Sequence, residues 1–292
     1  NKQYVIMDAP PDKEDIRPFI KIANKLIELE LSSPKIIAFD LEHGLMLLED
    51  LGDNLFAKVI EQYPEKELEL YSHAIQVLIE LYQKSENDKL SDIPLFDNEK
   101  MLKQVSLLTE WFLPLASGID NNQGLASEYI DIWQEILDKM PEIKKVMVLY
   151  DYHAENIIWL PERDSAKKCG LLDFQDAMLG LPVYDLVSIL EDVRRDVSQE
   201  TVEKSISYYL KATQINQEDF MLAYKIMGAQ RNCRIAGTFA RLAVRDKKPR
   251  YLEFMPRVWK HIENDVSHPM LAPLKFWLDK NIKPEWRGLL NK

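Results

Sequence analysis

The sequence predicts an α+β protein with a small strand-containing lobe at residues 1–52 and a large, mostly helical lobe at 53–292. Three observations lead to this prediction. Short apolar runs bounded by turn residues are concentrated before residue 52. From residue 55 onward, apolar side chains recur at spacings of three and four, which is typical of amphipathic helices. Three short β-like runs within 146–172 interrupt that helical pattern.

The small lobe is predicted to contain one strand, one helix and one hairpin. A strand at residues 4–7 ends before Pro10 and Pro11, because consecutive prolines break regular structure. Residues 14–31 place their apolar side chains on one helical face. Two apolar runs separated by a turn with a glycine then predict a β-hairpin over 36–48.

The large lobe is predicted to be helical around a short β segment. The expected helices are 67–84, 98–116, 126–139, 183–197, 200–213, 217–245 and 256–265. The β-like runs are 146–149, 157–160 and 170–172. A polar turn over 161–168 joins the last two runs, so we expect them to pair as a hairpin.

Composition limits the function classes that the chain fits. Its 292 residues are 46% hydrophobic and carry a net charge of −11, so no general attraction to nucleic acid or an anionic membrane is expected. Cys169 and Cys233 stand far apart, which excludes a disulfide framework and a zinc ribbon. No apolar run has the about 20 residues of a membrane span. We therefore expect a soluble, reduced, cytoplasmic protein, and the sequence does not indicate an oligomeric state.

Residues 146–160 and 169–177 contain the chemically informative pattern. Asp151 and Asn156 lie between two apolar runs, and Asp173 follows the next one. If 157–160 and 170–172 pair, Asn156 and Asp173 lie at adjacent strand ends and supply the hard oxygen ligands that Mg²⁺ prefers. Asp151 lies on the preceding loop, where it can accept a proton from an attacking hydroxyl. Each residue alone is more often a turn or cap residue, but the combination is much more specific and fits phosphoryl transfer.

This pattern resembles a known superfamily. Asp151-x-His153-x-x-Asn156 followed by Asp173-Phe174 is similar to the signature of the aminoglycoside phosphotransferase and choline kinase superfamily, relatives of the protein kinases. Further segments resemble the bacterial branch that contains the N-acetylmuramate/N-acetylglucosamine anomeric kinases of cell-wall recycling. These segments are 7–11, 48–52, 171–177, 184–188, 230–232 and 239–242.

The resemblance implies a bilobal protein-kinase-like fold and an ATP-dependent phosphotransferase. It implies that Asp151 is the catalytic carboxylate and that Asn156 and Asp173 hold Mg²⁺ against the phosphates of ATP. Asp185 matches an aspartate that braces the catalytic loop from a following helix, and His153 is expected to organise that loop rather than to act as a base.

The resemblance also predicts where the nucleotide binds. The sequence departs from the family pattern at several positions. Leu48 to Leu51 would form the hinge, with the backbone at Glu49 and Leu51 bonding the adenine edge. There is no Gly-x-Gly-x-x-Gly, and Met7 or Asp8 stands where a phosphate-contacting lysine is expected. The strands that cover the phosphates would lie upstream of residue 1. Leu149-Tyr150 replaces the His-Arg pair that often precedes the catalytic aspartate.

Candidate acceptor contacts are weaker, and alternatives remain open. Arg231 and Arg234 fall on one helical face with two further arginines, and this face either recognises an anionic group or is simply solvated and paired with acids. Asp176 either bonds a sugar hydroxyl or caps a turn. The acceptor is expected to be an amino sugar, with an aminoglycoside, choline or homoserine as alternatives. A nucleotide-binding module without catalysis is the alternative from another class.

Overall fold

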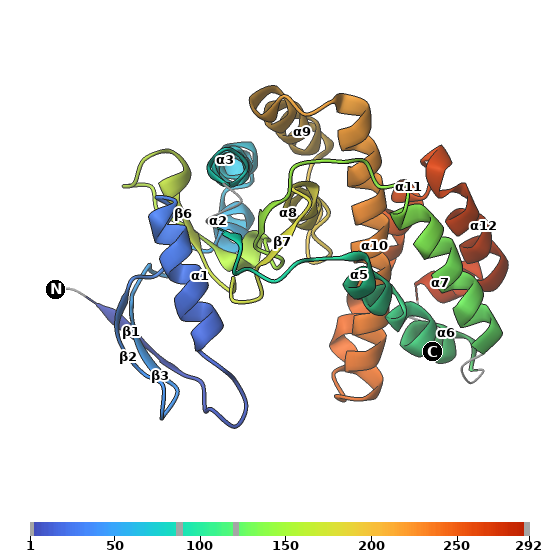
Figure 1. The fold of residues 1–292 in the computed structure, drawn as a ribbon, viewed down its shortest axis with the longest axis horizontal. Helices are drawn as coiled ribbons and strands as arrows, with labels where there is room; N and C mark the ends of the chain where they lie inside the picture. The colour runs from blue at the N-terminus through green and yellow to red at the C-terminus, as the bar shows by residue number, and fades with distance from the viewer. Residues whose placement is uncertain (1–2, 86–89, 119–122, 289–292) are drawn as a thin grey trace. The chain divides into compact units, whose positions relative to one another are not determined.

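The computed structural model describes residues 3–85, 90–118 and 123–288, and the chain forms two compact units (Figure 1). The first unit comprises Asn1–Leu95, Lys144–Leu190 and Val197–Gln214. The second comprises Phe96–Ile143, Glu191–Asp196 and Ile215–Lys292. The lobe boundary expected at residue 52 stays a prediction. In the described part of the chain, no helix is long and apolar enough to cross a membrane.

A three-stranded antiparallel sheet opens the first unit. Its strands are β1 (Tyr4–Asp8), β2 (Ile36–Asp40) and β3 (Leu45–Glu49), in the order β1-β3-β2. Alternation along β3 buries Met46 and Leu48 on one face, while Leu45 on the other face is exposed. The strand and the hairpin that the sequence predicts in this region are confirmed.

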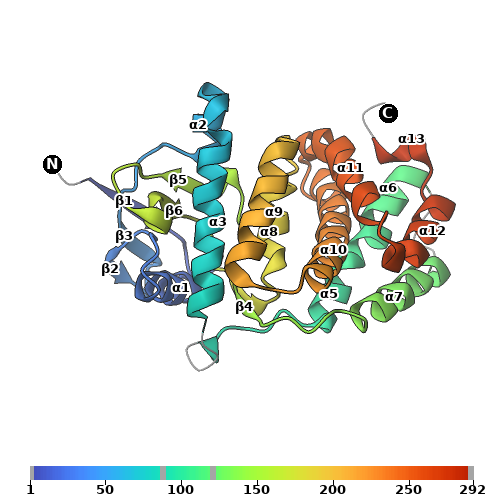
Figure 2. The ribbon, with the colours of Figure 1, turned by 90° about the horizontal axis from the view of Figure 1, so that it is seen from above.

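Helix α1 (Arg17–Glu28) lies beside this sheet in both views (Figures 1 and 2). Pro18 fits its first turn, where a backbone N–H has no partner within the helix. The apolar side chains of α1 recur at helical spacing, which buries Phe19, Ala23 and Leu26. The phenyl ring of Phe19 stacks on that of Phe174, with centroids 4.8 Å apart, and so ties α1 to the segment that follows Asp173.

In the described residues, two two-stranded antiparallel sheets and four more helices belong to the first unit. One sheet is the predicted hairpin, in which β5 (Ile157–Trp159) pairs with β6 (Cys169–Leu171). In the other, β4 (Val146–Val148) pairs with β7 (Met178–Gly180), a strand that the sequence analysis missed. The helices are α2 (Phe56–Gln62), α3 (Glu67–Lys84), α8 (Val183–Leu190) and α9 (Gln199–Thr213). Figure 2 shows α3 between the β5–β6 hairpin and α9, and it packs against both.

The second unit is helical. Its 28-residue helix α10 packs against α5, α11 and a π-helical turn, while α7 packs against α5 and α12. Its elements are α5 (Asn98–Val105), the π turn (Leu108–Phe112), α6 (Leu113–Ser117), α7 (Gln123–Leu137), α10 (Gln217–Val244), α11 (Met255–Asp265), α12 (Ala272–Asn281) and α13 (Pro284–Arg287).

Two helix predictions need correction. The helix expected over 98–116 is interrupted by the π turn, because Pro114 has no N–H to donate to the carbonyl four residues earlier. The helix expected over 183–197 ends at Leu190. Beyond it, Asp192 accepts a hydrogen bond from the backbone N–H of Arg194 at 2.9 Å, a local turn that competes with helical hydrogen bonding.

Candidate active site

The loop that follows β4 carries Asp151, and the buried carboxylate of Asp185 holds its backbone. Asp185 lies on α8, is 2% exposed, and accepts hydrogen bonds from the backbone N–H groups of Leu149 at 2.6 Å and Tyr150 at 2.9 Å. Further along the loop, the Tyr152 hydroxyl donates to the carbonyl of Ala74 on α3 at 2.8 Å. The two bonds to the buried Asp185 carboxylate are charge-assisted and strong, so α8 fixes the backbone before Asp151, while α3 holds the Tyr152 side chain after it.

Asn156 connects the loop to Asp173. Its Nδ2 donates to the carbonyl oxygen of Asp151 at 3.0 Å and to Oδ2 of Asp173 at 3.2 Å. His153 is 5% exposed, and its Nε2 lies 3.3 Å from the same amide nitrogen. The structure thus brings Asp151, Asn156 and Asp173 together, and it places His153 inside the loop.

Strand pairing explains why two residues so far apart in sequence meet. Ile157 on β5 is opposite Leu171 on β6, and the N–H of Leu172 donates to the carbonyl of Asn156 at 3.0 Å. Asn156 and Asp173 are therefore held where the two strands meet. Asp173 has a φ of +55°, which aspartate tolerates better than most residues, and its side chain is exposed to solvent.

The donor set suits a hard divalent cation. A carboxylate and an amide group supply oxygen ligands, and Mg²⁺ is usually held by one or two protein carboxylates together with phosphate oxygens and water. Within the ranges that the structure describes, no three His, Cys, Asp or Glu side chains are grouped to hold a metal by themselves. Asn156 and Asp173 therefore fit a magnesium ion that shares its ligands with a bound phosphate.

An apolar cluster lies next to the predicted hinge. Leu48 and Leu51 are buried, and Leu51 packs with Ile158 and Leu160 of the β5 segment. Leu172, immediately before Asp173, packs against the same cluster. The chain segment that contains Leu51 and the strand after Asn156 thus share one apolar cluster, and the contact of this segment with adenine stays a prediction.

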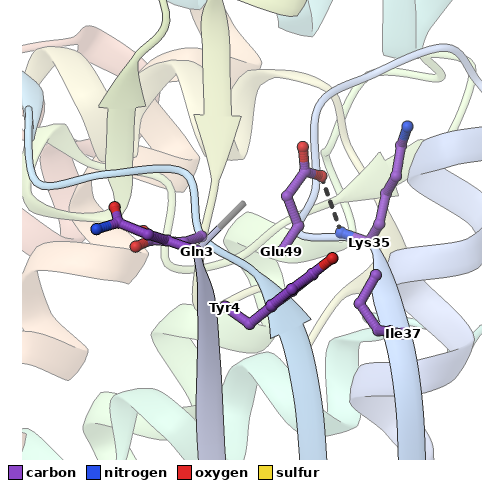
Figure 3. Close-up of a pocket in the computed structure, with 6 residues that line it drawn as sticks. Gln3, Tyr4, Lys35, Ile37 and Glu49 are labelled. Carbon is purple, nitrogen blue, oxygen red and sulfur yellow. Dashed lines mark hydrogen bonds between the residues drawn. The ribbon is translucent and has the colours of Figure 1, made fainter. Parts of the chain in front are cut away.

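Glu49, in the predicted hinge, accepts two hydrogen bonds through its carboxylate. Its Oε2 accepts a hydrogen bond from the backbone N–H of Lys35 at 3.2 Å (Figure 3), and its Oε1 accepts one from Nη2 of Arg163 at 2.9 Å. Figure 3 shows the Tyr4 side chain extending toward Ile37 beside these groups, over a surface pocket of about 280 Å³. Arg163 comes from the β5–β6 turn, so one carboxylate links the three-stranded sheet to the hairpin beside Asn156.

Comparison with known proteins identifies the family. A family model described as "Phosphotransferase enzyme family" matches residues 1–221. The chain belongs to this family. The resemblance predicted from the motifs around Asp151 and Asp173 is thereby confirmed, as is the prediction of a phosphotransferase.

Individual relatives of this phosphotransferase are similar over most of their length. An N-acetylmuramate/N-acetylglucosamine kinase of Caulobacter vibrioides is 39% identical over 320 residues, covering 98% of this chain and 88% of the relative. A kinase with the same name from Pseudomonas aeruginosa is 34% identical over 286 residues, covering 94% and 80%. The solved streptomycin–ATP–APH(2")-IIa ternary complex has a TM-score of 0.58 at 16% identity, covering 92% and 87%, and shows that the fold is the predicted protein-kinase-like one.

Two polar residues follow Asp173, one of the candidate metal ligands of the phosphotransferase. Oδ1 of Asp173 accepts a hydrogen bond from Nε2 of Gln175 at 2.7 Å. Partial burial raises the pKa of Asp176, and the negative charges of Asp173 and Glu14 raise it further. The structure thus places Asp176 near Asp173, and its contact with an acceptor stays a prediction.

The helical face of the phosphotransferase that carries Arg231, Arg234 and two further arginines is not uniformly exposed to solvent. Arg231 lies on α10, is 3% exposed, and donates from Nη1 to the carbonyl oxygen of Glu191 at 3.5 Å. Arg234 is partly buried on the same helix. Their contact with a substrate stays a prediction.

Sequence reasoning missed three features of the phosphotransferase site. Arg163 meets Glu49 from 114 positions away, a separation at which no local pattern signals a pair. The ring of Tyr150 stacks on that of Tyr184, a contact that the sequence motif at Tyr184 and Asp185 did not indicate. Gln175 stands two residues after Asp173, and at this short spacing its side chain reaches the Asp173 carboxylate and donates a hydrogen bond to it.

Proposed function

We propose that this phosphotransferase transfers the γ-phosphoryl group of ATP to the anomeric hydroxyl of an amino sugar, N-acetylmuramate or N-acetylglucosamine. Two relatives at 39% and 34% identity are N-acetylmuramate/N-acetylglucosamine kinases and support this acceptor, since the similarity covers nearly the whole chain. The fold relative solved as a ternary complex with streptomycin and ATP supports the donor. We expect the reaction to take place in the cytoplasm, where ATP is available.

The observation that carries the proposal is the position of Asn156. Its amide nitrogen bonds both the backbone carbonyl of Asp151 and the carboxylate of Asp173, which supports a single centre built from the proposed catalytic residue and a proposed metal ligand. Phosphoryl transfer needs mainly this kind of positioning and charge neutralisation.

In the proposed reaction, Asp151 orients the sugar hydroxyl and accepts its proton. The hydroxyl oxygen forms a bond to the γ-phosphorus as the bond from that phosphorus to the β,γ-bridging oxygen breaks, and ADP leaves. Asn156 and Asp173 would hold Mg²⁺, which neutralises charge on the phosphate oxygens when bound. Leu51, Ile158 and Leu172 offer an apolar surface to the adenine ring.

An acceptor panel tests the proposal directly. Radiolabelled ATP is incubated with the protein and, in parallel, with N-acetylmuramate, N-acetylglucosamine, an aminoglycoside, choline or homoserine. We expect label transfer to the amino sugars at a kcat/KM at least about tenfold above that for the other acceptors, a difference of 1.4 kcal/mol in transition-state stabilisation. Preferred transfer to another acceptor would replace the substrate assignment, and ATP binding without any transfer would select the non-catalytic alternative.

Asp151→Asn tests the assignment of the catalytic carboxylate. Asparagine keeps the shape of the side chain but removes its basicity, so kcat should fall by about 10²-fold or more while the Kd for ATP changes little. Asp131→Asn, at an exposed position on α7, is the matched control and should keep the wild-type rate. A kcat close to wild type in Asp151→Asn would refute the role assigned to Asp151.

A further inference from the structure

Tyr150, the residue immediately before Asp151, has an unusual backbone conformation. Its φ is +75°, and the N–H of Asp151 donates to the carbonyl of Leu149 at 3.0 Å. A hydrogen bond between residues on either side of a central residue with this φ defines a γ-turn of the rare, strained type. Glycine adopts positive φ freely, whereas a residue with a Cβ atom does not.

Such conformations persist only where the surroundings enforce them, and they are typical of functional sites. Asp173 also has a positive φ, but Asp is among the residues that tolerate it, and tyrosine is not. The strain of the catalytic loop is therefore concentrated at Tyr150, next to the carboxylate that must be aimed at the acceptor.

Two contacts hold Tyr150 in this turn. Its N–H and that of Leu149 both donate to the carboxylate of Asp185. In addition, its ring lies parallel to that of Tyr184, with the centroids 5.4 Å apart and the planes 5° apart. Tyr184 is fully buried and directly precedes Asp185 on α8. One turn of α8 thus restrains both the backbone and the side chain of Tyr150.

We propose that the Tyr150–Tyr184 stack is a positioning device that maintains the strained turn and thereby aims Asp151. Without the stack, relaxation to negative φ is favoured, and relaxation redirects the peptide that leads into Asp151. The left-handed penalty for a non-glycine residue corresponds to about 5- to 30-fold in a conformational equilibrium. An aromatic stack contributes about 2- to 13-fold, so it offsets a large part of that penalty. The inference rests on the proposed function in that Asp151 is taken as the catalytic carboxylate.

Tyr184→Leu tests the device, with Tyr184→Phe as the matched control that keeps the ring. We expect Tyr184→Leu to lower kcat by about tenfold, with the KM for ATP unchanged, and to speed amide hydrogen exchange in the 149–152 segment of the ligand-free protein. Tyr184→Phe should retain the wild-type kcat and exchange. Unchanged kcat and exchange in a folded Tyr184→Leu protein would overturn the inference.

Substitutions at Tyr150 separate turn conformation from simple packing. Both Tyr150→Ala and Tyr150→Gly abolish the stack, but only glycine adopts the turn without strain. We therefore expect kcat to fall about tenfold in Tyr150→Ala and to stay near wild type in Tyr150→Gly. Equal losses in the two variants would overturn the inference, and this comparison decides the question if Tyr184→Leu does not fold.

A double variant distinguishes the stack from other effects of the substitution at Tyr184. In the Tyr150→Gly background, Tyr184→Leu should change kcat by less than about twofold, because the turn no longer needs the stack. The same tenfold loss in both backgrounds would overturn the inference. All kcat ratios are measured with whichever acceptor the wild type phosphorylates. An acceptor other than an amino sugar would therefore overturn the proposed substrate but not this inference. If no acceptor is phosphorylated, the hydrogen exchange of the same variants decides the inference by itself.

Discussion

Replacing Asp265 with asparagine should make the stability of the protein less sensitive to alkaline pH. The Asp265 side chain is fully buried and hydrogen bonds to the carboxyl group of Glu191. Asn232 donates from Nδ2 to Oε2 of Glu191 at 2.7 Å and to Oδ2 of Asp265 at 3.3 Å. Burial raises the pKa of both carboxyl groups, and in Asp265 the charge of Glu191 adds to the increase. The Lys225 ammonium, 3.1 Å from Oδ1 of Asp265, opposes the shift without reversing it.

The sign and size of the effect follow from proton linkage. A carboxyl group whose pKa is raised on folding keeps a proton that the unfolded chain has released above about pH 4. The free energy of unfolding therefore falls as pH rises toward the folded-state pKa, by at most about 1.4 kcal/mol per pH unit for one proton. Asp265→Asn keeps a neutral side chain of the same shape and has no proton to lose. Its advantage over wild type should grow with pH, by about 2–4 °C in Tm for each kcal/mol.

Thermal unfolding at half-unit steps from pH 5 to 9 measures this difference. We expect the Tm of wild type to fall more steeply than that of Asp265→Asn, while Asp131→Asn, at an exposed site, follows wild type. Parallel curves for wild type and Asp265→Asn would show that Asp265 is already ionised in the folded state across this pH range, and would refute the prediction.

Two further predictions concern the hinge and the helix packing. Arg163→Met should raise the KM for ATP by up to about fivefold, because a partly exposed ion pair contributes at most about 1 kcal/mol. The exchanged pair Glu49→Arg/Arg163→Glu should recover part of the loss, and an unchanged KM in Arg163→Met would exclude a role for the pair in nucleotide binding. Gly237→Ala should lower the free energy of unfolding by about 1–3 kcal/mol in chemical denaturation, because its Cβ would lie 2.2 Å from the backbone carbonyl carbon of Leu107. Gly288→Ala, whose Cβ would meet nothing within 4 Å, is the control, and equal stability of the two variants would contradict the close packing.

Local patterns were sufficient for most of the fold. The helix predicted over 67–84 and the hairpin predicted from 157–160 and 170–172 are found where apolar spacing and turn residues placed them. Strand β7 was missed because Met178–Gly180 is too short to show alternation, and it forms only through its pairing with β4. The end of α8 at Leu190 was missed because the competing interaction is a side-chain turn at Asp192, which periodicity does not register.

Local patterns also predicted some residues of the candidate site but not others. Asp151, Asn156 and Asp173 were predictable because each lies at the end of a short apolar run, so their meeting follows from strand pairing. Glu49 and Arg163 were not predictable as a pair, because their contact depends on how a hairpin turn and a distant strand end are placed in three dimensions. The burial of Arg231 was likewise beyond a helical-face argument, since the acids that face it come from other segments.

The amide of Asn156 has a consequence for anyone who redesigns this centre. A single nitrogen restrains the main chain of Asp151 and the side chain of Asp173. In the proposed mechanism, the positions of the acceptor and of the cation therefore both depend on this amide. A substitution of Asn156 intended to admit a different cation therefore also shifts Asp151 in this mechanism. Changes of metal preference and of acceptor preference should arise together in variants at this position, and separating them requires compensating substitutions elsewhere in the loop.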